Sequence, residues 1–245
     1  NIESINTSLI SNFNTIINNG NKVIFYSKNP KIIDSFYSEI LLSNEKVKWG
    51  TTVSKSYIPE NYDSFFEKNL SLVEWLRQWS KNDEEREEVY IRGFLGKMLF
   101  SGEEALKSCK VLSGGEKVRC MLSKMMMKKG NVLILDEPTN HLDLDTIEWL
   151  EKYLLNQKVA MVIVSHDRSF LDKVCTRIVN TERGQSKSYL GNYTSYIQQR
   201  DFEFESTRVA YEKQQKDMQV QKAYIERFRA SATRSTQAKS REKLL

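Results

Sequence analysis

Val132-Leu133-Ile134-Leu135-Asp136-Glu137-Pro138-Thr139 decides the fold of this chain, because two adjacent carboxylates follow a short, wholly apolar run. Such a run is typical of a strand buried on both faces of a parallel sheet. A second apolar run, Val159–Val164, leads into Ser165-His166-Asp167. Ligands of open α/β sheets bind at the carboxyl ends of the strands. We therefore expect Asp136, Glu137 and His166 to lie at one edge of a sheet.

Helical patterns alternate with these runs, which indicates an α/β fold. Ser113 is a plausible helix cap and Gly130 a plausible stop. The charged run 81–88 is most simply a solvated loop. The expected strands are Lys22–Tyr26, Lys46–Trp49, Val132–Leu135 and Val159–Val164. The expected helices are Ser71–Trp79, Ser113–Lys129 and Thr146–Leu155.

Composition excludes several classes of protein. The 245 residues are 40% hydrophobic and 28% charged, with a net charge of +5, which predicts a globular chain. No apolar run approaches the ~20 residues that span a bilayer, and the first residues do not resemble a secretory signal. Cys109, Cys120 and Cys175 form no CxxC pair, so we expect reduced thiols, no zinc site and a cytoplasmic location.

The adjacent carboxylates suggest two different tasks. Successive strand residues point in opposite directions, so one carboxylate can hold Mg²⁺ on a nucleotide while the other orients or deprotonates a water. Asp136 is the candidate metal ligand, and Glu137 and His166 are the candidate catalytic residues, with His166 placed to contact a γ-phosphate. A solvated strand end and a polar loop residue are the simpler explanations of these side chains.

A second candidate phosphate site lies in Leu112-Ser-Gly-Gly-Glu-Lys117. A hydroxyl and two glycines at a helix N-terminus offer free N–H groups and the positive end of the helix dipole. Ser113, Gly114 and Gly115 are therefore candidate nucleotide-binding residues. An ordinary helix cap is the alternative.

From Tyr193 onward the chain shows a long, polar helical pattern. Phe204, Tyr211, Met218 and Ile225 recur every seven residues. This spacing favours one seam of an antiparallel helical hairpin. An amphipathic helix lying on the domain is the alternative.

The end of the chain is basic, with seven Lys/Arg against two acids after Gln221. Few aromatic residues accompany these cations, so we expect contacts to RNA phosphates rather than to bases. A solvated helix face is the alternative. The candidate RNA-binding residues are Lys222, Arg227, Arg229, Arg234, Lys239, Arg241 and Lys243.

Three motifs in this order, LSGGEKVR (112–119), LILDEPTNHLD (133–143) and IVSHD (163–167), resemble the signature helix, Walker B, D-loop and H-loop of an ATP-binding cassette. The undivided EPTNHLD run and the ending Ser188-Tyr-Leu-Gly-Asn-Tyr193 narrow the resemblance to the ABC-F family of tandem-cassette ATPases, many of which act on ribosomes.

The resemblance implies a P-loop NTPase-like nucleotide-binding domain over residues 1–190, followed by a helical interdomain linker with a basic tip over 191–245. It also implies ATP and Mg²⁺ as cofactors and Asp143 of the D-loop as a nucleotide contact. The implied partners are a second cassette, the ribosome, ribosomal RNA and tRNA, and no membrane.

The sequence departs from this family in two places. A cassette opens with GxxxxGK[ST], whose amides and lysine hold phosphates, but no glycine lies between Gly20 and Gly50, and Ile32-Ile33-Asp34 take the place of Gly-Lys-Ser/Thr. Glu60 follows Pro59 where a Q-loop glutamine is expected. In addition, residues 47–129 resemble a second cassette, whereas the chain from Asp143 onward resembles a first.

Three functions follow as hypotheses. The leading one is an ABC-F type ATPase, or a degenerate half of one, whose action is coupled to the ribosome. The alternative is a non-catalytic ribosome- or RNA-binding module that retains the cassette only as a fold and dimerisation surface. A separate ATPase subunit of a membrane transporter is disfavoured by the basic helical tail.

Overall fold

The computed structural model describes residues 2–5, 17–27, 47–182 and 185–228. The chain divides into two compact units, Asn1–Tyr196 and Ile197–Leu245. We refer to them as the N-terminal unit and the C-terminal unit. No helix within the described ranges is long and apolar enough to cross a membrane.

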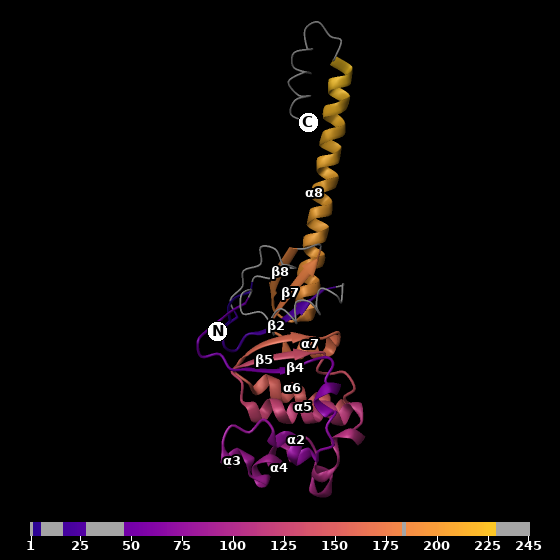
Figure 1. Ribbon diagram of the computed structural model, residues 1–245. Helices are drawn as coiled ribbons and strands as arrows, with labels where there is room; N and C mark the ends of the chain where they lie inside the picture. Colours follow the sequence, from indigo (N-terminus) through magenta and orange to yellow (C-terminus); the bar gives the residue numbers. More distant parts are fainter. Residues whose placement is uncertain (1, 6–16, 28–46, 183–184, 229–245) are drawn as a thin grey trace. The chain divides into compact units, whose positions relative to one another are not determined.

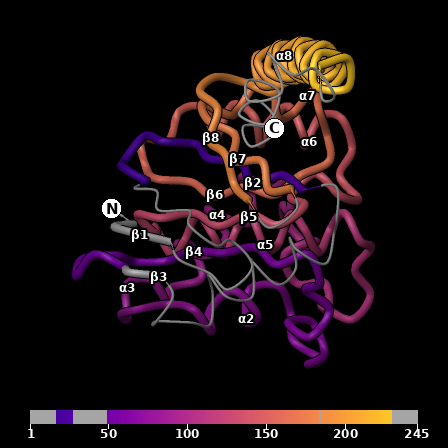
Figure 2. The backbone as a smooth tube through the Cα atoms, turned by 90° about the horizontal axis from the view of Figure 1, so that it is seen from above, coloured from indigo at the N-terminus to yellow at the C-terminus, as the bar shows by residue number. Residues whose placement is uncertain are grey.

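A six-stranded sheet in the order β4-β5-β6-β2-β7-β8 organises the N-terminal unit. All neighbours are parallel except β7 and β8, which are antiparallel. Figure 2 shows these strands side by side. Their bounds are Lys55–Ile58 (β4), Val132–Asp136 (β5), Ala160–Val164 (β6), Lys22–Tyr26 (β2), Arg177–Glu182 (β7) and Gln185–Leu190 (β8). A separate antiparallel pair joins β1 (Ile2–Ile5) to β3 (Val47–Trp49).

Helices cover one side of this sheet. In Figure 1, α5 and α6 run beneath the strands, and the short helices α2, α3 and α4 lie beyond α5. The α-helices of the N-terminal unit are α2 (Leu72–Arg77), α3 (Asp83–Arg86), α4 (Glu88–Lys97), α5 (Gly114–Lys128), α6 (Leu144–Asn156) and α7 (Arg168–Val174). Three short 3-10 turns accompany them: η1 (Asp63–Phe66), η2 (Gly102–Leu106) and η3 (Cys109–Val111).

The core forms on both faces of the two apolar strands. All five residues of β5 and all five of β6 are buried. Ile134 and Val162 pack in a cluster with Val23 of β2 on one face. Leu133 and Leu135 alternate with them and are also buried, so they fill the opposite face. The predicted parallel, doubly covered sheet is therefore confirmed.

The sequence places most elements correctly, but the prediction of a loop at 81–88 is wrong. Asn82 caps α3 by accepting a hydrogen bond from the Glu85 amide (2.9 Å), and α4 begins at Glu88. Acidic residues fill the first turn of α3, where the helix dipole favours negative charge. The charge run therefore signals a helix start as well as a solvated surface.

One long helix, α8 (Tyr193–Phe228), confirms the predicted helical pattern. Along the predicted seam, Phe204 and Tyr211 are exposed, whereas Ile225 is buried. The expected second helix of the hairpin lies outside the described residues.

The end of α5 differs from the expectation in one detail. Lys129, with φ 49°, is the left-handed residue that ends the helix, and not Gly130. Gly130 is required for another reason: a Cβ built on it would lie 2.8 Å from the backbone nitrogen of Ser56 and 3.0 Å from the carbonyl oxygen of Ser54. The turn between α5 and β5 thus passes directly against the segment that enters β4.

The close contact of Gly130 with the backbone of Ser54 and Ser56 predicts that one added methyl group will lower stability strongly. We expect Gly130→Ala to lower the free energy of unfolding by about 2 kcal/mol, because backbone atoms cannot move aside cheaply. Gly93→Ala in α4 is the matched control: a Cβ there meets nothing within 4 Å, so the change should stabilise by ~0.5–1 kcal/mol. Urea unfolding of both variants checks this, and equal stabilities would contradict it.

Candidate functional site

The parallel register brings the predicted carboxylates and histidine to one edge. Asp136 ends β5 opposite Val164, the last residue of β6. Its side chain is buried, with 8% of the residue exposed. Tyr26 ends β2 on the other side of β6. The residue types that can hold metal-bound phosphates are therefore delivered to the carboxyl edge, as expected for this class of sheet.

Glu137 leaves the strand through a left-handed backbone conformation with φ 45°. Its amide donates to the carbonyl of Val164 (2.9 Å), and its Oε2 accepts from the amide of His166 (3.3 Å). Its Oε1 lies 3.5 Å from Nε2 of His166. That buried oxygen accepts no hydrogen bond from any described residue, so it can accept one from a water or substrate.

The surroundings of Glu137 disfavour its charged form. Burial is the main cause that raises its pKa, and the negative charges of Glu60 and Asp167 act in the same direction, against the His166 contacts. Its side chain is 8% exposed, whereas that of His166 is 67% exposed. A raised pKa makes a carboxylate a stronger proton acceptor than an ordinary surface carboxylate.

The predicted phosphate site at the start of α5 has the local geometry of a capped helix. Ser113 Oγ accepts from the amide of Glu116 (3.3 Å), and Glu116 Oε2 accepts from the amide of Ser113 (2.7 Å). Lys107 holds the other oxygen of Glu116 at 2.7 Å. The cap that sequence reasoning offered as the simpler explanation is therefore present. It leaves Gly114 and Gly115 in the first turn without side chains to cover their amides.

The two glycines also meet the loop that follows β5. A Cβ on Gly115 would lie 2.7 Å from the carbonyl oxygen of His141, and one on Gly114 would lie 3.4 Å from the His141 side chain. His141 itself has φ 64°. Gly115 of the signature motif is thus needed for close packing against the EPTNHLD loop, whereas a Cβ on Gly114 would make an ordinary contact.

Asp143 is the cap of α6. Its Oδ1 accepts from the Thr146 amide at 2.8 Å. The hydrogen bonds from Thr146 are the main cause that lowers its pKa. It lines an open groove of about 440 Å³ together with Ser113, Gly114 and Gly115. We call this hollow the signature groove.

The predicted residues therefore form two groups. The signature groove collects Ser113, Gly114, Gly115 and Asp143, whereas Asp136, Glu137 and His166 gather at the strand ends. A further hollow of about 480 Å³ runs from Gly114 and His141 to Glu60. The predicted replacements at 32–34 and five of the seven predicted RNA contacts lie outside the described residues, whereas Lys222 and Arg227 are exposed on α8.

Sequence reasoning missed three residues of this region. Glu60 was noted only as a departure from a motif, yet its charge acts on Glu137. Lys117 binds Asp63 (Nζ to Oδ1, 2.6 Å) beside the hollow at Glu60. Arg119 lines the signature groove. Its place in LSGGEKVR was the available signal, since it lies one turn of helix beyond the glycines.

Comparisons with known proteins agree with this geometry. Two sequence models of the ABC transporter family match residues 33–140 and residues 179–245. The dimeric ATP-binding cassette MJ0796, solved with ADP and Pi, has the same fold at a TM-score of 0.58 and 16% identity, over 77% of this chain and 95% of that one. The fold and the motifs define an ATP-binding cassette.

The sequence relatives of this chain show which family of ATP-binding cassettes it belongs to. The ABC transporter ATP-binding protein YkpA of Bacillus subtilis is 40% identical over 206 residues, which is 82% of this chain and 38% of that protein. The ABC transporter F family member 5 of Arabidopsis thaliana is 49% identical over 148 residues, which is 59% of this chain and 21% of that protein. The chain belongs to the ABC-F family, and it spans less than two fifths of the length of these relatives.

The residues fit Mg²⁺ and ATP only in part. Asp136 offers the kind of carboxylate that holds Mg²⁺ together with nucleotide phosphates, although no set of three His, Cys, Asp or Glu side chains in the described ranges could hold a metal alone. No GxxxxGK[ST] occurs in the sequence. Asp136 is therefore the group at this edge that would hold Mg²⁺ beside nucleotide phosphates.

Removing the charge of Glu137 should change the pH dependence of stability. Because its pKa is raised in the folded state, the folded protein binds this proton more tightly than the unfolded chain, and stability falls as pH rises above about 4.5. We expect Glu137→Gln to melt at a higher temperature than the parent at pH 8, and the difference to vanish below about pH 4.

Glu74→Gln is the control, and its effect on the pH dependence of stability should have the opposite sign. Hydrogen bonds from Ser71 are the main cause that lowers the pKa of Glu74, so its stabilising effect is present above about pH 4.5 and lost as pH falls. Glu74→Gln should therefore melt below the parent at pH 8. Melting curves by circular dichroism from pH 3 to 8 test both variants, and a Glu137→Gln profile parallel to that of the parent would refute the assignment.

Proposed function

We propose that this chain is the cassette part of an ABC-F type ATPase that acts in trans, through its signature groove, on ATP held by a second cassette. The observation that carries the proposal is the separation of the two groups of residues. Ser113, Gly114 and Gly115 line an open groove, while Asp136 and Glu137 lie at strand ends that lack a recognisable phosphate-binding loop. Residues 191–245 would form the interdomain linker in this proposal.

The roles follow from the chemistry of each group. The amides at the start of α5 and the Ser113 hydroxyl would contact the γ-phosphate of the partner's ATP, with Asp143 at the edge of the same groove. Asp136 would share Mg²⁺ with phosphates on its own side, and Glu137, oriented by His166, would activate a water. Without a phosphate cradle, that second role needs a loop that the sequence does not contain.

The two sides predict different effects on the partner. With a complete cassette supplied, Gly114→Asp should lower the partner's ATP turnover at least ~10-fold, because it places a carboxylate at the anion site. Glu137→Gln should change that turnover less than ~2-fold. The chain alone should turn over far below an ordinary ~1 s⁻¹. Steady-state phosphate release measures all three.

Gly114 is preferable to Gly115 for this test. A Cβ on Gly115 would meet the His141 carbonyl, so a substitution there could act through misfolding. Gly114→Ala provides the matched control for volume without charge. Equal losses with Gly114→Asp and Glu137→Gln would reverse the assignment of sides. If ATP neither binds nor turns over in any combination, the non-catalytic module is the correct function.

The coupling to translation rests on charge. We propose that the basic end of the linker contacts structured RNA, such as ribosomal RNA or tRNA, through phosphates. Lys222 and Arg227 are exposed on α8, and Arg227 lies 5.5 Å from the Phe228 ring, which in turn packs on Tyr224 at 4.7 Å. The nearest aromatic rings are therefore engaged with each other, which favours phosphate contacts over base stacking.

RNA affinity should depend on salt and on these cations. If about four of seven cations meet phosphates, the slope of log affinity against log salt should be roughly −3 to −4. Lys222 and Arg227 changed together to Glu should weaken binding and flatten the slope. Lys213 and Lys216 changed to Glu, on the same helix, carry the same charge change as a control. Fluorescence anisotropy with ribosomal RNA fragments measures this, and undiminished binding after truncation at Gln221 would exclude the tail as the RNA contact.

A further inference from the structure

A second, smaller cavity lies beside the signature groove. Its volume is about 230 Å³, and it is bounded by the end of α4, the middle of α5 and the first turns of α6. Arg119 and Thr146 line both hollows, so the two lie next to each other at these residues. Pockets for drug-sized ligands hold ~300–1,000 Å³. This cavity therefore suits a single ring system with its substituents.

Arg119 provides an available anion-binding group in this cavity. Its guanidinium carbon lies over the Phe100 ring, 5.0 Å from the ring centre. No hydrogen bond or ion pair joins it to another described residue. A planar fork of N–H donors that lies over an aromatic ring and has no acceptor among the described residues matches a phosphate or carboxylate.

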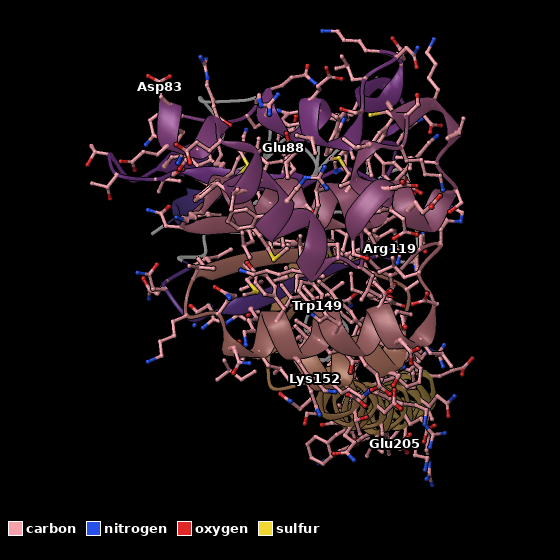
Figure 3. All side chains as sticks on the ribbon, turned by 90° about the horizontal axis from the view of Figure 1, so that it is seen from below. Asp83, Glu88, Arg119, Trp149, Lys152 and Glu205 are labelled. Carbon is pink, nitrogen blue, oxygen red and sulfur yellow. The ribbon has the colours of Figure 1, made fainter. Side chains whose placement is uncertain are left out.

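Trp149 provides a surface for a ring. Tyr153 stacks on one face of the indole, with the ring centres 5.2 Å apart and the planes at 9°. Trp149 also lines the cavity, so part of its indole is within reach of a planar ligand. Met98 and Leu99 form an apolar wall, with Leu99 66% exposed at φ 63°. Figure 3 labels Arg119 and Trp149 on the helical side of the sheet.

Two further charged side chains limit which chemical groups a ligand of this cavity can carry. Lys97 lies at the cavity with its ammonium 5.0 Å from the Phe94 ring, and Asp145 lies at the start of α6. A carboxylate accepts hydrogen bonds from an exocyclic amine, as in carboxylate recognition of cytosine. The cavity thus combines a cationic fork, an aromatic face and an acceptor. A ligand with a phosphate, a flat heterocycle and an amino group satisfies all three.

We propose that this cavity binds one nucleotide unit with an amino-bearing base: the base stacks on Trp149, its amine donates to Asp145, and its phosphate binds Arg119. The ligand is either a free mononucleotide or the terminal nucleotide of an RNA strand. This site is distinct from the ATP that the signature groove would meet in trans, and it does not depend on that role.

The test uses AMP as the probe with the whole chain. Calorimetric titration should give a Kd below ~1 mM, and both Arg119→Leu and Trp149→Leu should weaken it at least ~10-fold. Arg168→Leu is the matched control, since that arginine caps no part of the cavity and stacks on Tyr193. IMP, which carries a carbonyl in place of the amine, should bind more weakly than AMP, and Asp145→Asn should remove this preference.

A second variant guards against loss of fold. Leu99→Asp alters an exposed side chain at a left-handed position that Asp tolerates. Its negative charge should repel the phosphate and lower the affinity for AMP at least ~5-fold. Absence of AMP binding up to 5 mM, or unchanged binding in the folded Arg119, Trp149 and Leu99 variants, would overturn the site. A 5′-phosphorylated adenine hexanucleotide that displaces AMP at equal or lower concentration identifies an RNA end as the ligand, and no displacement identifies the free mononucleotide.

Discussion

The close approach of the α5 N-terminus to the loop after β5 is the constraint on which the candidate site depends. The carbonyl of His141 occupies the space that a side chain at position 115 would need. Glycine at this point therefore brings the signature helix, the D-loop and the start of α6 together around one groove. A bulkier residue would separate the helical layer from the strand that carries Asp136. Gly115 thus serves packing, and together with Gly114 it leaves the first turn of α5 without side chains beyond the α-carbon.

The carboxyl edge of the sheet obeys a different constraint. Parallel pairing of β5 with β6 aligns Asp136 with Val164, so the residues after each strand must meet. Glu137 then turns through a positive φ and is anchored to Val164 and His166. Burial raises the pKa of its carboxyl group, and the negative charges of Glu60 and Asp167 act in the same direction. The geometry thus places a buried carboxyl group beside an exposed histidine at this edge of the sheet.

The sequence indicated much of this arrangement because the signals were local. An apolar run that ends in Asp136-Glu137 predicts a strand end, and Ser113 followed by Glu116 three residues later marks a helix start. Contacts between distant segments left no such signal. Lys124 is buried with its ammonium 3.8 Å from the Phe65 ring and 4.7 Å from that of Trp79, and burial lowers its pKa to about 7. Nothing near Lys124 in the sequence indicates this.

Arg119 joins the two parts of the structure that carry chemistry. Its side chain lines the signature groove and the cavity at Trp149, and its positive charge also acts to lower the pKa of Asp143, after the hydrogen bonds from Thr146. An anion bound in either hollow would lie near the Arg119 guanidinium and would offset part of the positive charge that acts on Asp143. A ligand in the Trp149 cavity would therefore change the electrostatics of the groove without touching the glycines. Because the two hollows share this guanidinium, we expect an anion in one to weaken the binding of an anion in the other.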